Sequence, residues 1–372
     1  MITRVPTNIS KGLAIAAVAL VVGTGVTRAA PIHDLILAGA KPDGLYVIDP
    51  AARRILSEIH IAGANGSVSA IEPSPDGRVA YVLVNRMGSI VGVDLRTGKV
   101  VFRADLSQPG ERVKDFFTLA VSPDGRELVV CELPTRLLPG EYRVEEPRFA
   151  VFRTDAGLNA KAVRTFPAPR RISMLLMRPD GRSFYALGFD LYEYDLKTGR
   201  LLRTRGIQKW TLANHSQPDL LSFWPVTEPS GVFTSPLYSE EQVNGNGVPK
   251  TALMTLDLAS GNLDYHDFEQ TSGLIVTTVL SPDRKTAYGV FDALSRIDVG
   301  KHALDKRVPL DHAFYSINLS SDGQEIFLGG TMCDVAFYDA ANLEKKAVIK
   351  LPGCPDQVTT SLRVIRARWE PN

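Results

Sequence analysis

Short runs of apolar residues alternate with tight polar turns along nearly the whole of this 372-residue chain. Residues 79–84 (VAYVLV) are aliphatic except for Tyr81. Such a run is typical of a strand whose two faces are both covered. No helical spacing of apolar residues is sustained anywhere in the sequence. The pattern therefore predicts many short β-strands and an all-β fold.

One turn recurs between these runs. It reads Ser-Pro-Asp-Gly, and its full, near and looser copies lie at 74–77, 122–125, 178–181, 281–285 and 321–323. Proline presets φ at the second position of such a turn, aspartate can bond to its own backbone, and glycine accepts the left-handed conformation. Each copy therefore predicts a short hairpin between two strands.

A second signature gives the repeat length. An apolar run ends in aspartate, often followed two to four residues later by glycine, at positions 49, 94, 155, 195, 257, 298 and 339. The successive spacings are 45, 61, 40, 62, 41 and 41 residues, so the repeat is close to 41 residues with two lengthened units. Units of this length with four strands each, repeated seven times, predict a seven-bladed β-propeller of antiparallel blades. An extended solenoid is the alternative, but it would need polar capping units that the sequence does not show.

The two ends of the chain predict how the ring closes. The first unit lacks its innermost strand, since residues 35–37 are followed directly by the strand that ends at Asp49. After the last complete unit, residues 359–369 (TTSLRVIRARW) remain as one unassigned strand. We expect this C-terminal strand to pair into the first blade, so that residues 30–372 form a single propeller domain.

The propeller topology also sorts the loops. Strands a to d run from the innermost to the outermost of each blade, and both recurrent turns join a to b or c to d, on one side of the ring, the turn face. The b–c loops and the d–a links between blades lie on the opposite side, the elaborated face. The long segments are 132–148, 208–219 and 239–250, all on the elaborated face, and long loops on a trimmed scaffold commonly carry binding sites.

The N-terminus has the pattern of a signal peptide. Arg4 and Lys11 precede an apolar stretch at 12–26, and small residues at 27–30 suit cleavage after Ala29. The stretch is short for a membrane span, although an uncleaved anchor is the alternative. We expect residues 1–29 to be removed and the mature protein to be periplasmic, without a membrane partner. The formal net charge of +1 makes nucleic acid a poor partner.

Three cysteines are present. Cys333 and Cys354 both fall on the elaborated face next to the seventh blade, so a disulfide between them is geometrically sensible, but the separation of their Cα atoms cannot be obtained from the sequence. Cys131 ends a central strand and is expected to be a buried free thiol.

Candidate chemistry is sparse. The sequence has no Gly-x-Ser-x-Gly, His-Glu-x-x-His, Cys-x-x-Cys-His or phosphate-loop motif, and its six histidines lack ligand spacing, so we expect neither catalytic residues nor a metal site. Three segments at the rim of the elaborated face stand out. Their candidate residues for a substrate pocket or partner interface are Phe116 and Phe117 (beside Arg112 and Lys114), His215, Gln217 and Trp224, and His312, Phe314 and Tyr315. Core aromatics with a capping histidine are the alternative interpretation.

Several segments outside the generic turns carry a resemblance. LILAGAKPDGLYVIDP (35–50), ERVKDFFTLAVSPDGR (111–126), PAPRRISML (167–175), QPDLLSFW (217–224) and LDHAFYSINLSSDGQEIFLGG (310–330) occur in this order. Together with the signal peptide, they resemble the β subunit of quinohemoprotein amine dehydrogenase over essentially the whole mature chain.

That resemblance implies a role in a periplasmic heterotrimer that oxidises primary amines. In the family, a dihaem cytochrome c α subunit passes electrons onward, and a small γ subunit carries cysteine tryptophylquinone. The β propeller holds the γ subunit and helps to form the substrate pocket, so this chain is expected to hold no cofactor of its own. The lack of a haem motif is compatible with this division of roles.

Two other functions remain open from the sequence. A stand-alone periplasmic propeller acting as a binding or scaffold module would have a polar elaborated face. A lone propeller enzyme such as a lactonase would need metal-binding carboxylates at the mouth of the central channel, which the loops do not supply.

Overall fold

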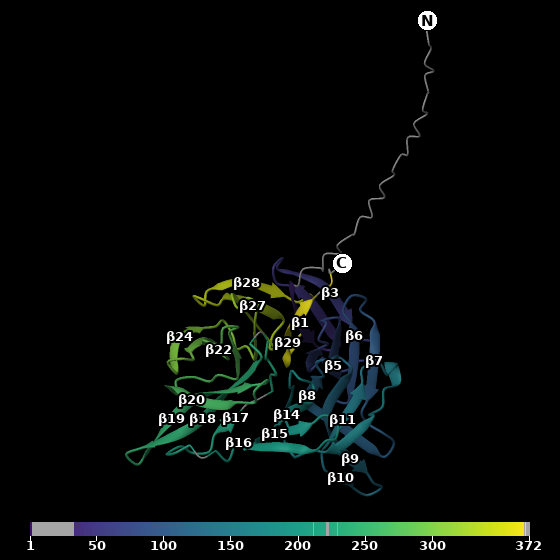
Figure 1. Ribbon diagram of the computed structural model, residues 1–372, viewed down its shortest axis with the longest axis horizontal. Coiled ribbons are helices and arrows are strands. Elements are labelled where there is room, and N and C mark those ends of the chain that lie inside the picture. Colours follow the sequence, from purple (N-terminus) through teal and green to yellow (C-terminus); the bar gives the residue numbers. More distant parts are fainter. Residues whose placement is uncertain (2–32, 211, 221–222, 229, 368, 370–372) are drawn as a thin grey trace.

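The strands of the chain are arranged as a ring of sheets (Figure 1). This computed structural model describes residues 1, 33–210, 212–220, 223–228, 230–367 and 369, so all but Met1 of the predicted signal peptide lies outside it. Within the described residues, the strands form seven antiparallel sheets, and the single helical turn is η1 (Gly157–Asn159). The predicted all-β, seven-bladed propeller is confirmed. No helix among the described residues is long and apolar enough to cross a membrane.

The blades follow one another along the chain, each with its strands in order from the innermost outward. The first three are β29 (Gln357–Ala367), β1 (His33–Ala40), β2 (Gly44–Asp49) and β3 (Arg54–His60); β4 (Ile71–Pro73), β5 (Val79–Val84), β6 (Ser89–Asp94) and β7 (Val100–Asp105); and β8 (Glu111–Val121), β9 (Glu127–Leu137), β11 (Arg148–Arg153) and β12 (Arg164–Pro167). The third blade has an added strand, β10 (Tyr142–Val144), which pairs with the end of β9.

The other four blades have the same order. They are β13 (Met174–Met177), β14 (Ser183–Leu187), β15 (Asp190–Asp195) and β16 (Leu201–Gly206); β17 (Asp219–Leu220), β18 (Val232–Val243), β19 (Asn246–Asp257) and β20 (Leu263–Gln270); β21 (Thr277–Leu280), β22 (Thr286–Val290), β23 (Ala293–Asp298) and β24 (Ala303–Pro309); and β25 (Ser316–Leu319), β26 (Glu325–Gly329), β27 (Asp334–Asp339) and β28 (Lys345–Lys350).

The ring closes through the C-terminal strand, as the sequence predicts. In Figure 1 the yellow strand β29 lies beside the purple strand β1. The two strands are antiparallel, with Leu35 opposite Ile365 and Ile36 opposite Val364. The first blade therefore contains both ends of the propeller, and unfolding it would open the ring.

The core lies between neighbouring blades. Alternate residues of β5 point to opposite sides, so Val82 and Val84 pack towards the first blade while Tyr81 and Leu83 pack towards the third. Each strand of this kind buries both faces, which explains its continuous apolar sequence.

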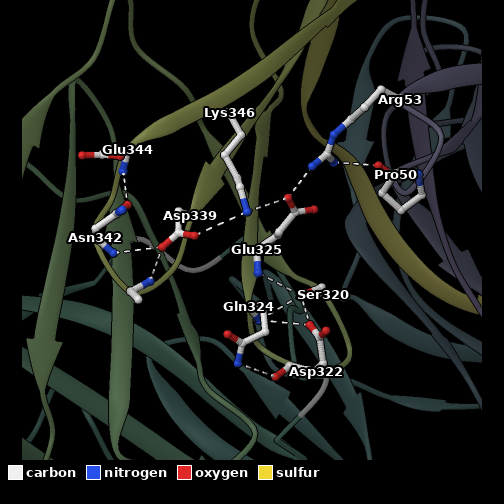
Figure 2. Close-up of polar contacts among 11 residues, drawn as sticks. Pro50, Arg53, Ser320, Asp322, Gln324, Glu325, Asp339, Asn342, Glu344 and Lys346 are labelled. Atoms are coloured by element: carbon white, nitrogen blue, oxygen red, sulfur yellow. Dashed lines mark hydrogen bonds and ion pairs between the residues drawn. The ribbon is translucent and has the colours of Figure 1, made fainter.

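The recurrent turns are held by a small set of side-chain hydrogen bonds. In the first copy, Ser74 Oγ donates to Asp76 and accepts the amide N–H of Val79, while Asp76 also accepts the amide N–H of Arg78. Figure 2 shows the equivalent contacts in the last copy, where Ser320 and Asp322 take these places. The turn is therefore a structural unit of each a–b hairpin.

Charged side chains join the last blade to the first on the turn face (Figure 2). The guanidinium group of Arg53 donates to Glu325 and to the carbonyl oxygen of Pro50. The Lys346 ammonium lies 3.4 Å from both Glu325 and Asp339. The contact of Arg53 with Glu325 therefore links blade one to blade seven independently of the β29–β1 pairing, and Lys346 adds contacts to Glu325 within blade seven.

Two segments that we expected to be long loops are largely strands. Residues 239–250 extend β18 and β19 into a hairpin with Asn244 and Gly245 at its tip, and this hairpin projects from the ring in Figure 1. Residues 132–148 lengthen β9 and add β10. Both arms lie on the elaborated face, and their alternation of polar and apolar residues is too short for the sequence to separate strand from loop.

The structure joins Cys333 to Cys354, with Cα atoms 4.7 Å apart. The bridge connects the turn before β27 to the segment that leads into β29. Cys131 is free and buried, and burial raises the pKa of its thiol.

Candidate partner-binding site

A bulge in the innermost strand of the third blade places two phenylalanines at the elaborated face. Pairing between β8 and β9 is interrupted between Asp115 and Leu119, and Phe117 takes the left-handed conformation with φ 63°. Phe116 is consequently turned outward and is 38% exposed. Left-handed backbone is uncommon for an aromatic residue, so surrounding contacts must hold it in place.

Asp115 is the residue that holds this bulge. Its side chain is fully buried and accepts hydrogen bonds from both the amide and the hydroxyl of Thr118, whose hydroxyl oxygen accepts the amide N–H of Cys131. Burial raises the pKa of Asp115 to about 7, against the lowering effect of the Thr118 contacts. No sequence motif points to Asp115, because its role depends on the bulge.

A second aromatic pair enters from the fifth blade. Trp224 is buried, and its indole N–H donates to the carbonyl oxygen of Thr359 in β29. Ser316 Oγ donates to the same carbonyl at 2.6 Å. These contacts fix Trp224 against the innermost strands of blades one and seven, far from it in the sequence.

Six aromatic rings form a continuous group, here called the aromatic cluster. Its centroid distances are 4.8 Å for Phe116–Phe117, 5.5 Å for Phe116–Phe223, 5.6 Å for Phe223–Trp224, 6.4 Å for Trp224–Tyr315 and 5.4 Å for Phe291–Tyr315. The structure thus brings together Phe116, Phe117, Trp224 and Tyr315, which we had singled out from the sequence. Phe223 and Phe291 were missed.

The aromatic cluster borders a pocket of about 690 Å³ between blades three, four and five. Phe116 and Phe223 line one side. On another side, the guanidinium of Arg171 lies over the ring of Phe189 at 4.4 Å. Such a stack holds a charged group beside an apolar surface. The pocket combines aromatic walls with a few polar groups, as ligand and partner sites do.

The remaining candidates from the sequence lie elsewhere. Phe314 is a core residue at 2% exposure, and its ring lies 4.1 Å from that of His312. His312 Nε2 is 3.2 Å from the carboxylate of Asp334, the first residue of β27. Gln217 is exposed, and His215 lies at the outer part of blade five beside Glu241 and Asp267. None of these four belongs to the aromatic cluster.

The basic residues near Phe116 do not reach the pocket. The ammonium group of Lys114 donates to the carbonyl oxygens of Asn85 and Arg86, and burial lowers its pKa. Arg112 is exposed. Neither Arg112 nor Lys114 is among the residues that line the pocket.

Two carboxylates lie near the propeller axis and share one arginine. Arg363 of β29 is buried and donates to Glu72 at 2.8 Å and to Glu228 at 2.7 Å. Burial raises the pKa of Glu72 to about 7, with Arg363 opposing the rise. Because an arginine occupies the place between them, these carboxylates do not form the metal-binding cluster that a lactonase would require.

The comparisons with known proteins show the fold alone. No protein-family model and no curated protein matches the sequence. Among solved structures, a functionally unknown protein from Desulfotomaculum acetoxidans is 11% identical with a TM-score of 0.58, over 90% of this chain and 99% of its own. Dihydro-haem d1 dehydrogenase NirN in complex with DHE is 16% identical with a TM-score of 0.54, over 90% and 76%.

Hydrazine synthase from Kuenenia stuttgartiensis is similar at 13% identity and a TM-score of 0.51, over 83% of this chain and 90% of that one. Identities this low carry no information on activity or substrate. They do support the architecture, because each match spans most of the ring. The chain is therefore a seven-bladed β-propeller whose elaborated face carries an aromatic pocket.

Proposed function

We propose that this chain is the propeller subunit of a periplasmic quinohemoprotein amine dehydrogenase. In this role it binds a small quinone-bearing subunit at the aromatic cluster and forms one wall of the pocket where primary amines are oxidised. A dihaem cytochrome c subunit completes the complex. The quinone and the haems belong to the partner subunits, and the quinone supplies the amine oxidation.

One observation carries this proposal. The pocket is lined by residues from three of the segments that resemble the amine dehydrogenase β subunit: Phe116 from 111–126, Arg171 from 167–175 and Phe223 from 217–224. A fourth segment, 310–330, supplies Tyr315 of the aromatic cluster. These segments are far apart in the sequence, and they meet at one surface of the elaborated face.

The aromatic surface suits the role of a wall rather than a catalyst. Aromatic side chains bury a large area with little loss of conformational freedom, and Phe116 is exposed enough to be covered by a partner. A covered aromatic wall excludes water from chemistry on a neighbouring subunit. A stand-alone scaffold with a polar elaborated face fits this surface less well.

The direct test is purification of the native protein from its own cells. We expect the chain to co-purify with a subunit that shows cytochrome c absorption bands and with a very small third chain whose mass reveals crosslinked residues. A colourless monomer that oxidises no primary amine would contradict the proposal.

The site itself is tested by charge insertion. Phe116→Asp or Phe223→Asp should release the small subunit, because either carboxylate would have to be desolvated when the partner covers the aromatic cluster. Subunit content after size-exclusion chromatography and amine-dependent dye reduction measure the loss. Val101→Asp is the matched control, since Val101 is 43% exposed on the outer strand β7. Equal subunit content in all three variants would exclude this surface.

A further inference from the structure

One histidine and two carboxylates converge on blade five from three separate segments. His215 lies in the link before β17, Glu241 in β18 and Asp267 in β20. One potential ligand atom from each residue lies within 4.8 Å of the other two. An imidazole nitrogen with carboxylate oxygens is a donor set that Zn²⁺ accepts.

Backbone pairing brings the segments together. His215 forms an isolated antiparallel bridge with Glu241, and the neighbouring Ser216 and Gln242 donate their amides to β18 and to the link respectively. Asp267 lies in β20, two strands away from the β18 strand of Glu241, and is opposite Ala252 of β19. The side chain of His215 therefore reaches over the sheet, which explains why no local ligand spacing appears in the sequence.

His215 is held in the orientation of a metal ligand. Its Nδ1 lies 3.0 Å from the carbonyl oxygen of Ala213, and its Nε2 faces Asp267 Oδ2 at 2.9 Å. Metal-binding histidines usually donate their other ring N–H to a carbonyl or carboxylate in this way. The side chain is 8% exposed, and Trp210 packs edge-on against the ring with centroids 6.0 Å apart.

Asp267 presents an unsatisfied atom. Its Oδ1 is buried and has no hydrogen-bond partner among the described residues. A buried carboxylate oxygen without a partner is costly, and a cation would satisfy it.

Glu241 is held by a competing cation. The ammonium group of Lys250 lies 2.9 Å from Glu241 Oε2, and this pair is partly exposed. Exchange of this contact for a metal bond costs little, because ion pairs that water can reach contribute little to stability.

We propose that His215, Glu241 and Asp267 bind one divalent transition-metal ion of the zinc type, through His215 Nε2 and one oxygen of each carboxylate. Three protein ligands leave the fourth position to water. The ion would join the link before β17, the projecting β18–β19 hairpin and β20 on the elaborated face. This site is independent of the amine dehydrogenase assignment.

Zinc titration of the full chain tests the proposal. The protein is prepared without a polyhistidine tag, with any co-purifying subunit left in place, and is treated with chelator and dialysed before calorimetry with ZnCl₂. We expect one equivalent to bind to the wild type. His215→Ala and Asp267→Asn should each weaken binding at least about tenfold, since loss even of an outer-shell partner has effects of 10–100-fold.

His60→Ala is the control, because it also removes one histidine beside two carboxylates, Asp43 and Glu58, but that side chain is 67% exposed. Its zinc affinity should equal that of the wild type. Wild-type stoichiometry below one, or affinity unchanged in Asp267→Asn, would overturn the site.

Two further measurements do not depend on removing a ligand. Lys250→Gln should tighten zinc binding, because it frees Glu241 from its competing cation. Cobalt bound to the wild type should give the intense visible absorption of a four-coordinate ion, and zinc should displace it. Weaker binding to Lys250→Gln, or a six-coordinate cobalt spectrum, would count against the proposed ligand set.

Discussion

Asp115 determines the local geometry of the aromatic cluster, and its burial makes stability depend on pH. Its pKa in the folded protein is raised to about 7 from a usual value of 3.8, so the folded state binds the proton more tightly than the unfolded state. The resulting stabilisation is complete below the unfolded-state pKa and is lost as the pH rises through about 7. Asp115→Asn keeps the acceptor for Thr118 but cannot ionise. We expect the wild type to lose about 2–4 kcal/mol relative to Asp115→Asn between pH 4 and pH 8.

Urea unfolding of both proteins across this pH range measures the difference. Asp311→Asn is the control, because Asp311 is exposed and the neighbouring Lys345 lowers the pKa of its carboxyl group. This control should show no relative gain as the pH rises. Parallel stability curves for the wild type and Asp115→Asn would mean that Asp115 remains ionised in the fold.

At the scale of the element, the disulfide secures the segment that leads into the ring-closing strand. Cys333 precedes β27 and Cys354 precedes β29, and Gln357 adds hydrogen bonds to the carbonyl oxygens of Met332 and Asp334. Cys333→Ser/Cys354→Ser should lower the free energy of unfolding by about 2–4 kcal/mol, because the bridge restricts the unfolded chain. Thermal and urea unfolding of the oxidised proteins measure this loss.

The reduced wild type is the internal control for this prediction. Cys131 is already a free thiol, so a reductant should change only the Cys333–Cys354 bridge. Reduced wild type and the double variant should then unfold alike. If the oxidised wild type is no more stable than the double variant, the bridge does not hold this segment.

At the scale of the whole molecule, the sequence predicts the features that arise from contacts between residues close together in the chain. The blade count follows from turns such as Ser74–Gly77, whose hydrogen bonds lie within a few residues, and the closure follows from a strand left without a partner. Phe116 and Phe117 could also be predicted, because their segment follows directly from the position of the loops in each blade. Phe291 and the contact of His215 with Asp267 could not, because they depend on register between strands that only the closed ring defines.

Arg363 joins three blades by charged contacts. It extends from β29 in blade one to Glu72 in blade two and Glu228 of blade five, and its side chain is only 4% exposed. Arg363→Met would leave two partly buried carboxylates, Glu72 and Glu228, facing each other without a cation. Removal of one partner from a buried ion pair costs about 3–5 kcal/mol, so we expect a loss of this size in the free energy of unfolding.

The cause of that loss can be separated from lost packing. Arg363→Met/Glu72→Gln/Glu228→Gln removes the unpaired charges and should recover part of the stability, because neutral amides are less costly to bury than carboxylates. Arg366→Met on the same strand is the control, since Arg366 is exposed and its loss should cost less than about 1 kcal/mol. A triple variant no more stable than Arg363→Met would show that Arg363 acts through packing of its aliphatic stem. The ring would then be closed by the β29–β1 pairing and the apolar seams between blades, with little contribution from charge at the axis.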